Sequence, residues 1–101
     1  MSDALATAHK FEQFVSLHGE DPFVASTVAK MISTRLSKLR KELKTVEQTL
    51  ARFERRYGKS SDTFLKEYLA GVAGDDMDFI EWSSLITMRE RLSSERELLR
   101  A

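Results

Sequence analysis

The chain has 101 residues, with 16 basic and 16 acidic side chains, no cysteine and a single proline. This balance of charge argues against a protein that wraps nucleic acid, which needs a clearly basic domain. The lack of cysteine excludes disulfides, thiol catalysis and thiolate metal sites. Low glycine content, together with many Leu, Glu, Lys and Arg residues, predicts a single all-α domain over residues 1–101.

The first 19 residues are predicted to form a short amphipathic helix that ends at Gly19, with Leu5, Phe11 and Phe14 among its apolar positions. The opening residues do not combine a basic head with an apolar run, as a signal peptide would. No stretch reaches the ~20 apolar residues of a membrane helix. We therefore expect a cytoplasmic protein without a membrane segment.

A long helix is predicted over residues 21–57, because Asp21 can cap its start, Pro22 suits its first position and Gly58 suits its left-handed end. Apolar residues follow one another along it at steps of four and three. This heptad seam consists of Ala25, Ala29, Ile32, Leu36, Leu39, Leu43, Val46, Leu50, Phe53 and Tyr57. Such a seam faces a partner helix along its whole length. The partner is either another helix of the chain, in an elongated antiparallel hairpin or coiled coil, or a second copy in a homodimer, and both can hold together.

A run of basic residues lies on the same helix but avoids the seam. It consists of Arg35, Lys38, Arg40, Lys41 and Lys44. Charged residues are common on the solvated exterior of a coiled coil. The functional alternative is a stripe that contacts phosphates or an acidic partner, with an affinity that depends on salt. We do not favour nucleic acid, since no aromatic residue interleaves with the run.

Two further helices are predicted. The first covers residues 60–71, with Ser60 or Ser61 as its cap and Gly71 at its end. The second covers residues 75–100 and carries apolar residues on two neighbouring lines, which are Phe79, Trp82 and Ile86, and Leu85, Met88, Leu92 and Leu99. Folded back antiparallel, this last helix covers the long helix from Tyr57 to about Leu36. The earlier part of the seam is then left for the N-terminal segment or a second chain.

Four acids begin the last helix. They are Asp75, Asp76, Asp78 and Glu81. Helix capping and the favourable end of the helix dipole account for them, with Asp75 or Asp76 as the cap. The alternative, a metal site, lacks both the Asp-x-Asp-x-Asp-Gly loop and a histidine. Neither the two histidines nor the serine pairs match a catalytic motif. We therefore expect no metal, no other cofactor and no enzyme activity.

The run FERRYGKSSDTFLKEYLAGVAGDDMDFIEWSSLITMRERL, preceded by the heptad helix, resembles a group of small prokaryotic proteins. These read YG-x-S, then a short Phe-bearing helix, then GDD-x-DF-x-EW, and are similar to antitoxins of two-gene toxin–antitoxin modules. The resemblance extends from about Phe14 to Leu92; Lys59 and the longer AGVAG joint depart from the pattern. It implies a protein that neutralises a cognate toxin by direct binding.

This resemblance gives a candidate partner-binding set: Asp75, Asp76, Asp78, Phe79, Glu81, Trp82 and Ile86. Aromatic anchors dominate such interfaces, and acids steer a basic partner. The structural alternative is that Phe79 and Trp82 pack against Leu50 and Phe53 inside the hairpin. Two other functions remain open. One is a coiled-coil dimerisation or adaptor protein without a toxin, and the other is a DNA-binding autoregulator that would use the basic run.

Overall fold

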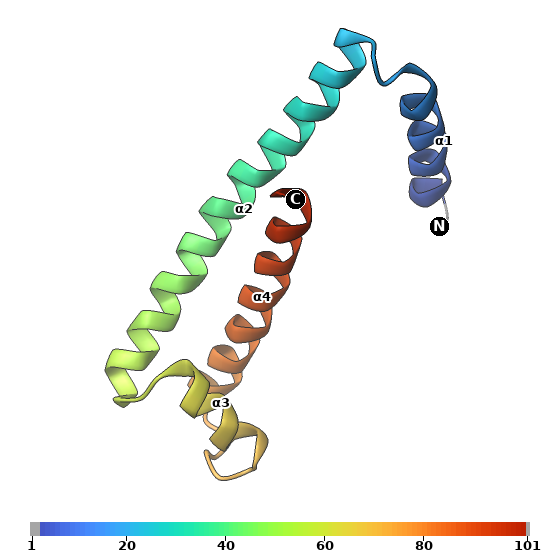
Figure 1. Cartoon of the computed structure of the whole chain (residues 1–101). Coiled ribbons are helices and arrows are strands. Elements are labelled where there is room, and N and C mark those ends of the chain that lie inside the picture. The colour runs from blue at the N-terminus through green and yellow to red at the C-terminus, as the bar shows by residue number, and fades with distance from the viewer. Residues whose placement is uncertain (1–2, 101) are drawn as a thin grey trace. The chain divides into compact units, whose positions relative to one another are not determined.

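The computed structural model describes residues 3–100, and within that range every regular element is an α-helix (Figure 1). The helices are α1 (Asp3–His18), α2 (Pro22–Tyr57), α3 (Ser61–Leu69) and α4 (Met77–Arg100). The all-α prediction is confirmed. The structure divides into two compact units, and the boundary between Arg35 and Leu36 lies inside α2. The prediction of a single domain stays a prediction.

The ends of α2 follow the predicted chemistry. The carboxylate of Asp21 accepts a hydrogen bond of 2.8 Å from the backbone N–H of Phe23, and Pro22 is the first helical residue. At the other end Gly58 has a φ of 66°, the left-handed conformation that stops a helix at little cost for glycine. These two signals fix a helix that runs without interruption between them.

The starts of α3 and α4 resolve two choices that the sequence leaves open. Ser60, and not Ser61, caps α3, because its hydroxyl accepts a hydrogen bond of 3.1 Å from the backbone N–H of Thr63. Asp76 caps α4, since its carboxylate accepts one of 2.8 Å from the backbone N–H of Asp78. Each cap satisfies an amide that the helix itself leaves without a partner.

The second unit is an antiparallel helical hairpin. The part of α2 that follows Leu36 runs beside α4, with α3 at the closed end (Figure 1). The buried core comprises Leu39, Leu43, Val46, Leu50, Phe53, Phe64, Trp82, Ile86 and Leu92. Leu36 and Leu99 pack against this core, so α4 reaches back as far as the sequence predicts. Burying each such side chain stabilises the fold by about 1.5–3 kcal/mol.

Aromatic rings fill the closed end of the hairpin. The ring of Phe64 on α3 stacks on Trp82 at a centroid distance of 3.9 Å and an interplanar angle of 1°. Phe53 and Tyr57 of α2 stack on the same indole at 5.5 and 5.7 Å. The indole Nε1 donates a hydrogen bond of 3.0 Å to the buried hydroxyl of Ser61. Three helices are therefore joined through one side chain.

The first unit has little interior. Among residues 3–35 only Val24 is buried, and α1 contributes no buried residue. Six large apolar side chains are between 42% and 80% exposed: Leu5, Phe11, Phe14, Leu17, Phe23 and Met31. On α2, Ala25 and Ala29 are exposed and Ile32 is half-buried. The described part of the chain thus leaves the beginning of the heptad seam uncovered.

Candidate protein-binding site

Part of the predicted partner-binding set faces inward. Trp82 is fully buried and Ile86 is 2% exposed, because both lie on the line of α4 that packs against α2. Phe79 is half-buried, with its ring 5.1 Å from Tyr57 in an edge-on contact and 5.4 Å from Phe64. The prediction that Trp82 and Ile86 anchor a partner is corrected: both are core residues of the hairpin.

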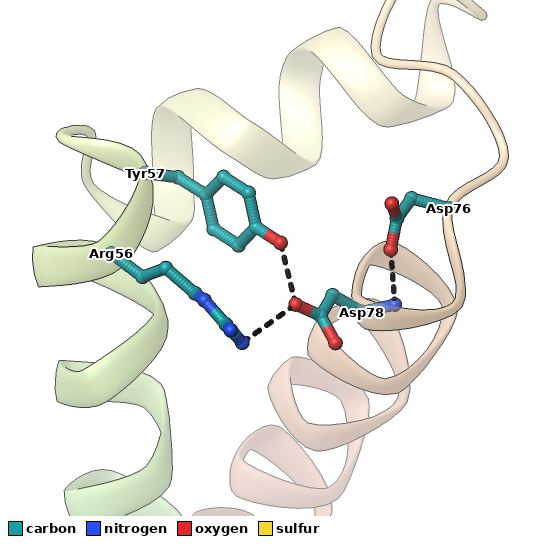
Figure 2. A network of polar contacts seen from close by, with 4 residues as sticks. All are labelled: Arg56, Tyr57, Asp76 and Asp78. Carbon is teal, nitrogen blue, oxygen red and sulfur yellow. Dashed lines mark hydrogen bonds and ion pairs between the residues drawn. The ribbon is translucent and has the colours of Figure 1, made fainter.

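Asp78 ties the end of α2 to the start of α4. Figure 2 shows its carboxylate accepting hydrogen bonds from Arg56 Nη1, at 3.0 Å, and from the Tyr57 hydroxyl, at 2.5 Å. Asp76, which caps the helix, accepts from the Asp78 backbone in the same view. Because Arg56 is 67% exposed, its ion pair with Asp78 is screened by water and contributes at most about 1 kcal/mol. Asp78 thus already has two partners within the chain.

This arrangement changes the acidity of Tyr57. Its pKa is raised above the ordinary value, first because the hydroxyl donates to Asp78, then because burial disfavours the phenolate. The negative charges of Asp78 and Asp76 raise the pKa further, while Arg56 lowers it. The phenol therefore stays protonated and acts as a hydrogen-bond donor.

A shallow pocket of about 210 Å³ lies beside this contact. It is lined by Thr49, Arg52, Phe53, Arg56, Asp78 and Glu81. Small-molecule sites usually enclose about 300–1,000 Å³ between mostly apolar walls. This pocket is smaller and carries two bases and two acids, so its geometry does not favour a small-molecule ligand.

Residues 69–80 carry the exposed surface at the closed end of the hairpin. We define the tip surface as Leu69, Val72, Asp75, Met77 and Ile80. Its four apolar side chains are between 46% and 78% exposed, and Asp75, like Asp76 and Glu81 nearby in sequence, is exposed too. The tip surface combines apolar area with acidic charge.

Asp75 belongs to the predicted partner-binding set, whereas Leu69, Val72, Met77 and Ile80 do not. A signal for the last two is present in the sequence. Met77 and Ile80 are three residues apart, and they fall outside both apolar lines predicted for this helix. At about 100° per residue they share a face that turns away from Phe79 and Trp82. An apolar pair outside the packed stripe indicates exposed hydrophobic surface.

The basic run lies on the outer face of α2. Lys38, Arg40, Lys41 and Lys44 are exposed, and Arg35 is half-buried. Arg40 and Lys44 line an open groove of about 470 Å³ in which Glu47 supplies an acid and Arg96 a further base. Contact of this run with phosphates or with an acidic partner stays a prediction.

Within residues 3–100, no group of three or more His, Asp or Glu side chains is arranged to hold a metal ion. None of the helices in that range has the length and apolar character needed to cross a bilayer. Comparisons of the chain with protein-family models, with curated proteins and with solved structures each found no match.

Proposed function

We propose that this chain is a cytoplasmic, antitoxin-type protein that neutralises a cognate small toxin by direct binding. The resemblance of about residues 14–92 to antitoxins supplies the functional class. The tip surface supplies the observation that carries the proposal. The apolar side chains of the tip surface are exposed, whereas the apolar side chains that α2 and α4 turn toward each other are buried in the core.

The chemistry of the tip surface fits a protein partner. Protein interfaces combine an apolar centre with a polar rim, and exposed apolar surface rimmed by polar residues marks such sites. Here Met77 and Ile80 supply apolar area, while Asp75 and Glu81 supply negative charge. Acids in this position attract a basic surface and raise the rate of association. The partner expected from the resemblance, a toxin that acts on RNA, has a basic site.

The contacts that hold α2, α3 and α4 together at the closed end of the hairpin favour tight binding at the tip surface. Stacked rings of Phe64 and Trp82 fix α3 against α4, and Asp78 fixes α4 against α2. A surface that is already ordered loses less conformational entropy when a partner binds. The tip surface is therefore presented in one arrangement before the toxin arrives.

A growth assay tests this function. Any small reading frame that adjoins this gene is expressed alone and together with the chain, and growth is followed. We expect the adjoining product to stop growth alone and the chain to restore it. The double variant Met77→Ser with Ile80→Ser should bind at least about tenfold more weakly and fail to restore growth, because it removes exposed apolar area.

The matched control changes Met88→Ser and Leu98→Ser, which also removes one methionine and one aliphatic residue from the exposed positions of α4. It should still restore growth. Circular dichroism verifies that both double variants remain helical. Full neutralisation by the tip variant, or a harmless adjoining product, would contradict the proposal.

A second candidate function is an adaptor that dimerises and has no toxin partner. The exposed seam residues Ala25 and Ala29 favour it, since a heptad stripe without cover is typical of a helix-pairing surface. The same assay separates the two candidates. An adaptor predicts a harmless adjoining product and a chain that self-associates.

A further inference from the structure

The groove of about 470 Å³ on the hairpin brings together bases from two helices. Arg40 and Lys44 of α2 and Arg96 of α4 line it, and Glu47 is the one acid among its lining residues. Because Arg40 and Lys44 are one helical turn apart, their side chains lie on the same face of α2. The groove therefore carries an excess of positive charge, in a chain whose net charge is zero.

These bases are available to an anion. Within residues 3–100, neither Arg40 nor Lys44 forms an ion pair. Arg96 contacts its neighbour Glu97 at 3.5 Å, and Glu97 is 66% exposed and also contacts Arg100. Such a long contact with an exposed acid contributes little. The Nε atom of Arg96 is buried and has no hydrogen-bond acceptor among the described residues.

The positive charge continues along α2 in a second groove, of about 450 Å³. Arg52 and Arg55 line it, and none of its described lining residues is acidic. Arg52 donates a hydrogen bond of 3.3 Å to the hydroxyl of Thr49, and in the described part of the chain neither arginine forms an ion pair. Gln48 and Ala51 line both grooves, so the two grooves are neighbours.

The two grooves together form one basic surface. We define the basic track as the lining residues that can donate hydrogen bonds to an anion: Arg40, Lys44, Gln48, Arg52, Arg55 and Arg96. Arg40 and Arg55 are 15 positions apart, and at 1.5 Å per residue the track extends about 22 Å along α2. This length suits a chain of anions better than a single one.

The lining of the basic track indicates which anion fits. Arg and Lys bind phosphate groups through charge-assisted hydrogen bonds, and the amide of Gln48 offers a further donor. The apolar centre that protein partners need is missing, because the apolar lining residues are only Leu43, which is 3% exposed, and Ala51. No aromatic ring lines either groove, whereas single-stranded nucleic acid stacks its bases on such rings.

We propose that the basic track binds a linear polyphosphate, a chain of phosphate groups that carries no bases. Arg40, Lys44 and Arg96 hold one part of this chain, and Arg52 and Arg55 hold the next. A broad duplex would instead contact exposed lysines outside the grooves, such as Lys38 and Lys41. Binding does not depend on a toxin, since the track shares no residue with the tip surface.

Isothermal titration calorimetry of the full chain with inorganic polyphosphate tests this site. We expect binding that weakens at least about tenfold between 50 and 200 mM salt, because the phosphates neutralise several bases. Orthophosphate should bind at least about tenfold more weakly, since it occupies only part of the track. Single-stranded and duplex oligonucleotides with as many phosphates should also bind more weakly than polyphosphate.

Three outcomes would overturn the proposal. Failure of polyphosphate to bind would remove the site. Equal affinity for orthophosphate would show that no extended track exists. Equal affinity for either oligonucleotide would make the ligand a nucleic acid, and not a chain without bases.

Two matched pairs of variants locate the ligand. Lys44→Gln should weaken polyphosphate binding at least about threefold, whereas Lys41→Gln removes an exposed lysine outside the track and should have less than half that effect. Likewise Arg96→Gln should weaken binding and Arg100→Gln should not. Circular dichroism verifies that all four variants remain helical. Equal effects within either pair would refute binding in the grooves, whatever any toxin does.

Discussion

Ser61 at the start of α3 binds both neighbouring helices, α4 through its side chain and α2 through its backbone. Its hydroxyl accepts from the Trp82 indole at 3.0 Å, and its backbone N–H donates to the carboxylate of Glu54 at 2.8 Å. The sequence motif places a serine here, but only the fold shows that its partner is an indole 21 residues away. A buried donor that loses its acceptor is costly, so this hydroxyl matters more than its size indicates.

Replacement of Ser61 tests that contact. Ser61→Ala leaves the Trp82 N–H buried without an acceptor, and we expect the free energy of unfolding to fall by about 1–3 kcal/mol. Ser84→Ala, at an exposed position of α4, should change it by less than about 0.5 kcal/mol. Urea denaturation measures both. Equal stability of the two variants would show that the hydrogen bond contributes nothing.

Tyr57 gives a pH-dependent test. Its folded pKa is raised above the unfolded value, so the protonated phenol contributes stability that is complete below about pH 10 and is lost as pH rises through the folded pKa. In a Tyr68→Phe background, ultraviolet titration should place the Tyr57 midpoint above 10.0. Asp78→Asn should lower that midpoint, because it removes the carboxylate acceptor and its charge.

The control for this titration is Asp75→Asn. Asp75 is an exposed acid three residues from Asp78 and has no part in raising the pKa of Tyr57. Its removal should leave the midpoint in place. A midpoint that moves equally in both variants would mean that general negative charge, and not the contact with Asp78, sets the acidity.

Among the helices, α2 was the easiest to predict and α4 the hardest. The strict spacing of four and three residues places the apolar residues of α2 on a single face. Asp21 and Gly58 mark where the helix begins and ends. In α4 two apolar lines lie side by side, so spacing alone could not tell whether Trp82 faced α2 or a partner. Only the structure shows that Trp82 faces α2, because its indole stacks on Phe53 of α2 and on Phe64 of α3.

The short helix α3 shows a similar limit. Helical spacing in the sequence predicts that Phe64 and Leu69 both belong to its apolar face, yet Phe64 is 1% exposed and Leu69 is 75% exposed. The two residues are five positions apart and therefore point about 140° away from each other. A helix of nine residues contacts its neighbours along one narrow stripe, and Leu69 falls outside it.

Truncation of one core leucine between α2 and α4 should destabilise the fold strongly. Leu39 is fully buried, so Leu39→Ala should lower the free energy of unfolding by about 2–5 kcal/mol through lost burial and a cavity. Leu98→Ala removes the same atoms from an exposed position of α4 and should cost less than about 0.5 kcal/mol. Thermal and urea unfolding provide the comparison. Similar losses at the two sites would mean that α4 does not cover the seam as described.

At the scale of the whole molecule, the heptad seam is buried in one unit and exposed in the other. From Leu36 onward it is covered by α4, whereas Ala25 and Ala29 remain exposed in the first unit. The sequence predicted this change, because α4 is too short to reach the earlier turns. It could not predict how weakly α1 packs, since spacing shows an apolar face but not what covers it.

Amide hydrogen exchange of the free chain tests the central claim that α4 and the later part of α2 form a self-sufficient hairpin, whereas the first unit has little interior. Exchange reports the free energy of local opening, residue by residue. We predict that the amides of Leu39–Phe53 in α2 and Trp82–Leu92 in α4 exchange slowest, while those of α1 exchange fast. Seam amides that exchange as fast as those of α1, or an α1 equally protected in the monomer, would contradict this account.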